Sequence, residues 1–592
     1  MAAEIQRNKG IAIPIIILFG IVLAGFYYFS GYTGFKLLIA ALLIAPLFYI
    51  AYLIASYKGP KKSKLYGIEG LTAKLPAVKK AKGHVEFKYK LMWTAIIVIL
   101  YFALTNVYVY GLNTSQTVDV FASFRAIFAG ASGSLMDLGI GPIVTASIVM
   151  QLFAGAKIFN LDLQNSEDKA IYQGMQKLLV IIMIFVEAIP QAFGYLVPDA
   201  SLVSSINAVV PGYGGFLSQA IIVMQLFLGS YLVFLMDEVV SKYGIGSGIS
   251  LFIAAGVSQQ LFTGTFNWLP QVVGTPLSLA TGNTPAGAIP KMIFIITHAS
   301  SGYMYSNGAV QILFQQPNPM IALVGTLLIF FIVAYFQSSK IELPIAHERV
   351  RGARGRYPIQ LFYASNIPVI LATALLANVS MWTLLFWNSP VLSKIPIIGH
   401  NGLLGSYPSA AMIASYGSNV LQNTTPTGGL AYYLFTPNGL SDWLFPILQP
   451  SSYSSILLGH APWQEGMHIL VFVAFMVIAS VIFAKFWIET TNMGASSVAK
   501  QIQSSGMQIP GFRRDPKVME RVLSKYIPAI TVFSGATVGL LAAGANLIGT
   551  VGDTSGTGLL LAVGIVIQTY EAMGREQLME MHPVIRQFFA GG

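Results

Sequence analysis

Apolar stretches of about 20 residues, the length of helix that crosses a hydrocarbon core of about 30 Å, recur along the whole chain. This recurrence limits what the chain can fold into. Hydrophobic residues make up 55% of the 592 residues and charged residues only 10%, whereas about 25% of the residues of a soluble domain are charged. The stretches lack the period-two alternation of membrane β-barrel strands. The sequence therefore predicts an all-α polytopic membrane protein.

Hydropathy and helix-breaking residues predict twelve spans, the first two of which form an N-terminal transmembrane hairpin over residues 1–57. The first span follows Arg7 and Lys9 as a signal peptide would, but no convincing cleavage site comes after it, so a retained helix is expected. The predicted spans are residues 11–30, 35–56, 91–111, 141–155, 175–196, 216–237, 246–265, 319–337, 366–387, 468–488, 527–549 and 557–573.

Basic segments set the expected orientation of these spans. Segment 58–90 holds ten lysines and two acidic residues, so the positive-inside rule places it in the cytoplasm. Counting spans from there puts segments 338–365, 489–526 and 574–592 on the same side, and each of them carries arginines. Twelve spans leave both termini in the cytoplasm, and an odd number would not.

A break precedes one unusually short span. In GSLMDLGIGPIVTASIVMQLF, which runs from Gly133 to Phe153, two glycines and a proline stand directly before the apolar run. The preceding segment, 124–138, is too short and too polar to cross the membrane. Irregular backbone is tolerated at membrane depth only where it is buried in protein or lines a cavity. Two interpretations stay open here: a segment that re-enters the membrane, or an external loop before a short helix.

Two aliphatic pairs lie at helical spacing. Ile140 and Val144 flank the break, and Ile249 and Ile253 follow the small-residue run GIGSG. Residues at i and i+4 share one face of a helix, and such a face could line a hydrophobic constriction that blocks ions by excluding water. Apolar residues at this spacing more often pack on lipid or on neighbouring helices, so the pattern alone favours packing.

Several chemistries have no motif in the chain. There is no cysteine, the seven histidines are scattered, and HExxH, GxSxG, Walker A and GxGD patterns are missing from the sequence. We therefore expect no enzyme activity, no metal and no cofactor. Glu187 is the clearest carboxylate within a span, whereas an ion-coupled transporter usually carries several near the membrane midplane.

Long ordered motifs resemble a known family. LGIGPIVTASIVMQLF, LDLQNSEDKAIYQGMQKLL, DEVVSKYGIGSGISLFIAAGVSQ, ELPIAHERVRGARGRYPIQLFYASNIPVILATALLANV, FWIETTNMGASSVAKQI and YEAMGREQLMEMHPVIRQFF are similar to SecY, the channel subunit of the Sec translocon, in its archaeal and eukaryotic branch. The resemblance covers roughly residues 71–592. It implies a ten-helix bundle in two pseudo-symmetric halves, 91–265 and 319–573, to which this chain adds its hairpin.

The resemblance also implies roles for individual residues. A ring of aliphatic side chains would form the waist of the pore: Ile140, Val144, Ile249, Ile253, Ile370 and Leu561. The segment 124–138 would be a plug that caps this ring from outside, with candidate residues Phe124, Arg125, Ser134, Leu135 and Leu138. A polar cluster in a lateral gate would contain Thr145, Glu187 and Asn378, although these residues could equally be ordinary interhelical hydrogen-bonding partners.

The resemblance also implies that two cytoplasmic loops of this chain dock the ribosome. The candidate residues are Arg351, Arg354, Arg356, Arg513 and Arg514. Arginine suits phosphate and acidic surfaces because guanidinium makes forked hydrogen bonds, although charge that only sets topology is the alternative.

The implied function is a protein-conducting channel in the plasma membrane of a prokaryote. It would translocate unfolded secretory chains and release transmembrane segments sideways into lipid. The implied partners are a SecE-type (gamma) subunit, a small single-span (beta) subunit, the ribosome, signal sequences, nascent chains and membrane lipids. A secondary transporter and an inactive relative that serves as an insertion scaffold or receptor are the rival hypotheses.

Some parts of the chain depart from the family pattern. The N-terminal hairpin is extra, and the external segments near 266–318 and 388–467 are longer than expected. The hairpin could mimic or dock a partner helix, or only anchor the chain. Glycosylation sequons begin at Asn113 and Asn423, but two such matches arise easily by chance, so unmodified asparagines are the favoured interpretation.

Overall fold

The computed structural model describes residues 17–20, 22, 24, 35–56, 63–79, 81, 83, 85–113, 124–155, 158–159, 161, 165–194, 196–271, 275–280, 282–347, 354–360, 366–388, 392–395, 397–409, 412–413, 424–451, 453–491, 493–504, 507–508, 516–552 and 554–581. Within these ranges, nine helices are long and apolar enough to cross a membrane. They are α4 (Phe87–Thr105), α7 (Ser166–Gly194), α9 (Gly214–Tyr243), α10 (Gly248–Phe266), α14 (Met320–Ser338), α15 (Ile367–Asn388), α20 (Pro462–Thr490), α22 (Pro516–Ile548) and α23 (Gly556–Met581).

Two further helices match predicted spans. The short helix α6 (Gly141–Gly155) follows the break, and α2 (Phe35–Ser56) is the second helix of the N-terminal hairpin. The predicted helical membrane bundle is thus confirmed. The exact total of twelve spans and the domain boundaries stay predictions, because most of the first span lies outside the described residues.

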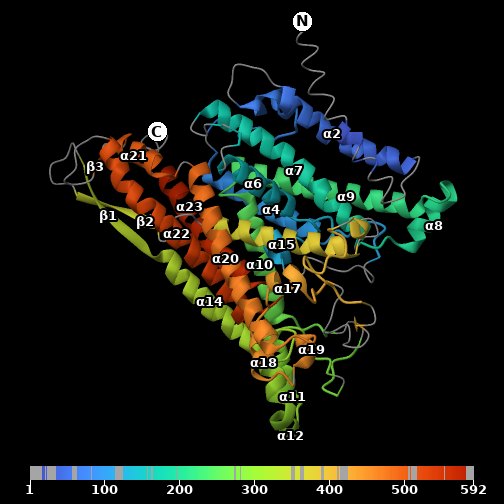
Figure 1. Cartoon of the computed structure of the whole chain (residues 1–592). Helices are drawn as coiled ribbons and strands as arrows, with labels where there is room; N and C mark the ends of the chain where they lie inside the picture. The colour runs from blue at the N-terminus through green and yellow to red at the C-terminus, as the bar shows by residue number, and fades with distance from the viewer. Residues whose placement is uncertain are drawn as a thin grey trace.

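The bundle consists of two groups of helices that meet along two seams. The first group is α4, α6, α7, α9 and α10, and the second is α14, α15, α20, α22 and α23 (Figure 1). On one seam α10 packs against α23, and α4 is joined to α23 by an ion pair of 2.7 Å between Lys90 Nζ and Glu576 Oε1. On the other seam α6 contacts both α15 and α20.

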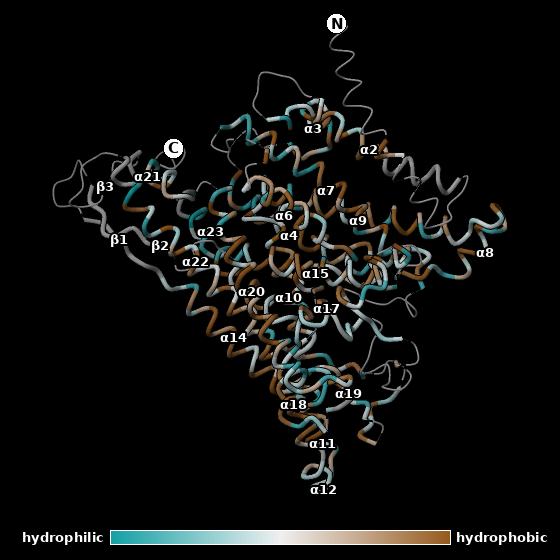
Figure 2. Tube along the Cα trace, in the orientation of Figure 1, coloured by the Kyte–Doolittle hydropathy of each residue, from teal (hydrophilic) through white to brown (hydrophobic). Residues whose placement is uncertain are grey.

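Both groups share one hydrophobic core. Helix α14 illustrates how a membrane helix divides its surface. Ile329 and Val333, one helical turn apart, are 3% and 1% exposed, whereas Phe331 is 67% exposed. Since lipid is as apolar as a protein interior, both faces of such a helix are hydrophobic, and Figure 2 shows α14 as apolar along most of its length.

A small sheet lies outside the bundle. Strands β1 (Lys340–His347) and β2 (Arg354–Gln360) form an antiparallel hairpin, and β1 also pairs with β3 (Met507–Gln508), so that the strand order is β2-β1-β3. Ala346 of β1 pairs with both Arg354 and Gln508. The sheet was not among the predictions, although Ile341, Leu343 and Ile345 alternate with the period of a strand. It joins the two arginine-containing loops to each other.

Short helices gather at the end of the bundle opposite the sheet (Figure 1). They come from the segments that were expected to be external. The helices are α11 (Ala288–His298), α12 (Ser301–Tyr303), η3 (Met304–Gly308), α13 (Ala309–Leu313), η4 (Leu392–Lys394), α17 (Gly429–Leu434), α18 (Leu440–Leu448) and α19 (Ser454–Leu457). Helix α8 (Ala200–Val209) lies apart from them, beside the end of α9 (Figure 1).

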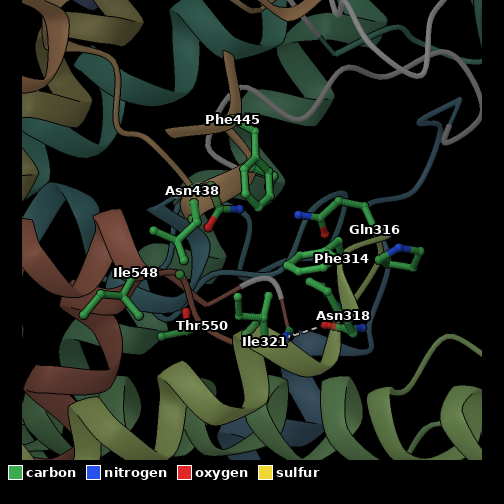
Figure 3. A pocket seen from close by; sticks show the side chains of 16 residues that line it. Phe314, Gln316, Asn318, Ile321, Asn438, Phe445, Ile548 and Thr550 are labelled. Carbon is green, nitrogen blue, oxygen red and sulfur yellow. Dashed lines mark hydrogen bonds between the residues drawn. The ribbon is translucent and has the colours of Figure 1, made fainter. Parts of the chain in front are cut away.

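The segment 266–318 is tied to the second group of helices at a small pocket (Figure 3). Asn318, directly before α14, accepts a hydrogen bond of 2.6 Å from the backbone N–H of Gly552 in the turn between α22 and α23. The Asn318 side-chain amide also donates to the carbonyl of Ala286 at 2.8 Å. Phe314, Phe445 and Ile548 line the same pocket. One asparagine therefore connects three stretches of chain where the external segment joins the bundle.

Candidate functional site

Five of the six aliphatic residues predicted for the pore waist belong to the core shared by the two groups of helices, and Ile249 packs against this core. They lie at the start of α6, on α10, on α15 and on α23. Ile140, Ile253 and Leu561 are fully buried, Val144 and Ile370 are nearly so, and Ile249 is partly buried. The structure thus brings all six into the interior where the groups meet. Their arrangement as a ring stays a prediction.

The segment 124–138 lies inside the bundle, and therefore does not form the external loop of the alternative interpretation. It contains the short helix α5 (Arg125–Phe128), which packs against α10. Phe124, Ser134 and Leu138 are buried, and Leu135 is partly buried. Phe124 lines a void with no room for a water molecule, together with Leu376 of α15 and Met476 of α20. The segment consequently touches both groups of helices.

A buried ion pair closes this segment on itself. The Arg125 guanidinium lies 3.0 Å from the Asp137 carboxylate, measured from Nη2 to Oδ1, and also donates to the Asp137 carbonyl. The same carboxylate accepts a hydrogen bond of 2.8 Å from the backbone N–H of Gly133. Arg125 and Asp137 are 7% and 2% exposed. Asp137 was not predicted as a site residue. The sequence offers one signal for it: an acidic residue follows the basic Arg125 after a stretch rich in glycine and serine.

Three contacts hold the segment 124–138 against α4, α9 and the start of α6. The backbone N–H of Ile140 donates to the carbonyl of Phe128 at 2.7 Å. The Tyr101 hydroxyl of α4 donates to the carbonyl of Ala129 at 3.0 Å. Gly229 of α9 lets the backbone of Leu135 approach so closely that a Cβ there would lie 1.7 Å from its carbonyl oxygen. These contacts are therefore made largely by backbone groups.

Each glycine of the break and its proline is required at its position for a different structural reason. Gly139 has φ of +53°, a left-handed conformation that costs other residues free energy, and a Cβ there would lie 2.1 Å from the Phe128 carbonyl oxygen. At Gly141 a Cβ would lie 3.0 Å from Glu187 Oε2. Pro142 stands in the first turn of α6, where its missing N–H costs nothing. The break thus combines a tight turn with close approach to α7.

The three residues predicted for the lateral gate form a continuous chain of hydrogen bonds across three helices. Asn378 Nδ2 of α15 donates to Thr145 Oγ1 of α6 at 3.1 Å, and Thr145 Oγ1 lies 2.8 Å from Glu187 Oε1 of α7, to which it can donate. The Thr145 hydroxyl also lies 3.0 Å from the Gly141 carbonyl oxygen. Glu187 is 5% exposed. The cluster therefore spans the seam between α6–α7 and α15.

The arginines predicted for docking are only partly within the described residues. Arg354 and Arg356 belong to β2. Arg351, Arg513 and Arg514 lie outside the described residues. The pairing of β1 with β3 nevertheless holds the two loops side by side.

Comparison with known proteins decides the family. The SecY profile matches residues 134–570, and a profile described as the plug domain of Sec61p matches residues 99–133. The chain belongs to the SecY family. The plug-domain match overlaps the first ten residues of the segment 124–138 and ends before Asp137. Residues 1–98, which include α2, lie outside both profiles.

Curated relatives of this SecY-family chain include archaeal proteins. The protein translocase subunit SecY of Archaeoglobus fulgidus is 44% identical over 515 residues, which cover 87% of this chain and 96% of that protein. The Haloferax volcanii protein of the same name is 43% identical over 524 residues, which cover 88% of this chain and 98% of that protein.

Solved structures agree with these matches. One described as a protein conducting channel has a TM-score of 0.66 and 37% identity, and the match covers 88% of this chain and 99% of that one. Sec61 in the canine ribosome-channel complex from the endoplasmic reticulum has a TM-score of 0.63 and 36% identity, with the same coverage. The predicted family and its channel fold are confirmed.

Proposed function

We propose that this SecY-family protein-conducting channel passes unfolded secretory polypeptides through the aliphatic ring and releases apolar segments sideways between α6–α7 and α15–α20. The observation that supports this proposal most is the chain of hydrogen bonds from Asn378 through Thr145 to Glu187. It joins the two groups of helices along one seam, next to the buried segment 124–138. A channel that opens both across the membrane and sideways into the lipid needs two groups of helices that can separate along such a seam.

The ring suits a seal that must fit many sequences. Branched aliphatic side chains offer no hydrogen-bond partner to water or ions, so a closed ring excludes both. The same side chains can change rotamers around an extended polypeptide, since their contacts are not directional. Fixed polar groups at the waist would instead select particular substrates.

The polar cluster suits a gate that must open repeatedly. A side-chain hydrogen bond between membrane helices contributes only about 0.6 kcal/mol on average. The two bonds of the cluster are therefore strong enough to bias the seam toward closure and weak enough to be replaced when a signal sequence enters. Apolar segments then leave into lipid because the hydrophobic effect favours them there.

The proposed function also names the partners of the channel. The sheet formed by β1, β2 and β3 would present the arginine loops to the ribosome, as the canine Sec61 relative in a ribosome-channel complex indicates. A SecE-type (gamma) subunit and a small single-span (beta) subunit would complete the translocon. We place it in the plasma membrane of a prokaryote with both termini in the cytoplasm. The chain itself hydrolyses nothing, and elongation of the substrate or another partner drives transport.

Crosslinking tests the pore assignment. The chain has no cysteine, so Ile140→Cys or Ile253→Cys introduces a single thiol at the waist. A secretory chain stalled in the reconstituted complex, with one cysteine in its translocating part, should form a disulfide with either variant. Phe331→Cys is the control, because Phe331 is 67% exposed on the surface of α14 and lies away from the shared core.

Absence of a crosslink at both waist positions in a productively engaged complex would contradict the pore assignment. Saturable uptake of a small solute that disappears in Glu187→Gln would instead indicate a secondary transporter.

Charge reversal tests the docking loops. Arg354→Glu combined with Arg513→Glu should weaken ribosome binding by about tenfold or more, since each contact of arginine with phosphate contributes on the order of 1 kcal/mol. Co-sedimentation with ribosomes over a series of salt concentrations measures the affinity, and the variant should also show a shallower salt dependence. Arg575→Glu, on the exposed C-terminal part of α23, is the matched control. Unchanged affinity at physiological salt would refute the assignment.

A further inference from the structure

The N-terminal hairpin reaches the gate helix α7 through a short connecting segment. This segment, residues 63–75, contains η1 (Lys64–Ile68) and α3 (Glu69–Thr72), and we call it the collar. The collar touches α2 on one side and α7 on the other, and Figure 1 shows α2 on the same side of the bundle as α7. Residues 1–98 lie outside both family profiles, so the profiles assign no role to α2 or to the collar.

Apolar side chains from all three parts meet in one buried cluster. Ile50 of α2, Ile68 of the collar and Leu178 of α7 are 8%, 0% and 6% exposed. Partly buried residues around them are Leu53, Ile54, Leu71, Leu75, Met175 and Ile182. Within the hairpin, the rings of Phe19 and Phe48 lie edge to face at 5.1 Å, so its two helices are in contact. Burial of this cluster links hairpin, collar and gate helix.

Two specific contacts fix the collar to the cytoplasmic end of α7. The Tyr66 hydroxyl donates a hydrogen bond to the Asp168 carboxylate in the first turn of α7. This bond is the largest cause that raises the pKa of Tyr66 to about 12. Thr72 packs so closely on Gly174 that a Cβ there would lie 3.0 Å from the threonine side chain.

Helix α7 carries this attachment to the seam. Gln176, between the contacts at Gly174 and Leu178, donates to Ser147 Oγ of α6 at 2.8 Å. Glu187 lies nine residues beyond Leu178, or about 13 Å along a helix that rises 1.5 Å per residue. The collar therefore holds the cytoplasmic half of a helix whose outer half carries the gate cluster.

We propose that the N-terminal hairpin is a brace that holds α7, and α6 with it, against α15 and α20 and so favours the closed seam. For the seam to open, α7 must tilt away from α15. The collar resists this tilt because a tilted α7 has to drag a membrane-embedded hairpin with it or lose the contacts at Ile68 and Asp168. The inference rests on the proposed gate function of the seam.

A disulfide across the cytoplasmic end of the seam measures closure without any substrate. Gly155 of α6 lies so near Phe486 of α20 that a Cβ at Gly155 would come within 2.3 Å of the phenylalanine ring. The pair Gly155→Cys and Phe486→Cys removes the ring and places two thiols at this contact. In this otherwise Cys-free chain, the rate of oxidative disulfide formation between the two introduced thiols reports how often the seam is closed.

The brace predicts that loosening the collar slows this disulfide. Tyr66→Phe should slow it by about threefold, the factor that corresponds to about 0.6 kcal/mol for one hydrogen bond, and Ile68→Ala should slow it further. Leu47→Ala is the matched control, since Leu47 is on α2 but 38% exposed, and should leave the rate unchanged. Equal rates in wild type, Tyr66→Phe and Ile68→Ala would overturn the brace.

Parallel crosslinking with the single-cysteine variant Ile253→Cys separates this inference from the channel function. Where a stalled chain still crosslinks to Ile253→Cys while collar variants leave the disulfide rate unchanged, only the brace is wrong. Where the waist crosslink fails in the wild-type collar background, the channel assignment itself is wrong.

Discussion

Replacing Arg125 by methionine should raise the resting ion conductance of the reconstituted channel by at least tenfold. The change leaves the Asp137 carboxylate, only 2% exposed, without the guanidinium that lies 3.0 Å away. Removing one partner of a buried ion pair costs about 3–5 kcal/mol because the remaining charge is buried without compensation. The segment 124–138 can relieve this cost by moving Asp137 toward water, and under the proposed function this movement should open the seal.

A double variant distinguishes loss of the ion pair from general damage. Arg125→Met combined with Asp137→Asn removes both charges and keeps an oxygen that can accept from the Gly133 N–H. Neutral replacement of both partners is often tolerated, so the double variant should leak less than Arg125→Met alone. Single-channel recordings in planar bilayers measure both conductances. A double variant that leaks as much as the single one would show that the pair does not hold the seal.

Gly139→Ala should also open the seal, through shape alone. A methyl group at this position would lie 2.1 Å from the Phe128 carbonyl oxygen, well inside van der Waals contact. The backbone must move, and the 2.7 Å hydrogen bond from the Ile140 N–H to that carbonyl is then lost. We expect a clear increase in ion leak together with a lower concentration of substrate needed for half-maximal translocation into proteoliposomes.

Gly212→Ala is the matched control for this variant. Gly212 has φ of +83°, so alanine suffers a similar backbone penalty of about 1 kcal/mol there, but no atom lies within 4 Å of the added methyl group. Only the clash differs between the two variants. If both leak equally, backbone strain and not displacement of the segment 124–138 explains the effect.

Much of the fold could be predicted because a membrane helix is recognisable from the hydropathy of its own residues. Long apolar runs such as Met320–Ser338 have one structure available in lipid, since all their backbone hydrogen bonds must be made within the segment. The Thr145, Glu187 and Asn378 cluster was predicted from family motifs, and the structure places these side chains in contact.

Other features depend on contacts that no local pattern specifies. The partner of Arg125 lies across an irregular loop, where residue spacing does not determine which groups meet. The pairing of β1 with β3 joins segments about 160 residues apart, and only the alternation within β1 is visible in the sequence. The docking of Ile50 on Leu178 through Ile68 likewise requires three separate segments to come together.

The run from Phe124 to Thr145 has a consequence for substrate choice. It contains the Arg125–Asp137 pair, the proposed waist residues Ile140 and Val144, and a hydroxyl of the polar cluster, within 22 consecutive residues. The Ile140 N–H also bonds directly to the Phe128 carbonyl. If the proposed ring and gate act as described, a mutation that tightens the barrier to ions should also raise the hydrophobicity that a signal sequence needs for acceptance. The proposed function therefore predicts that ion leak and substrate stringency change together.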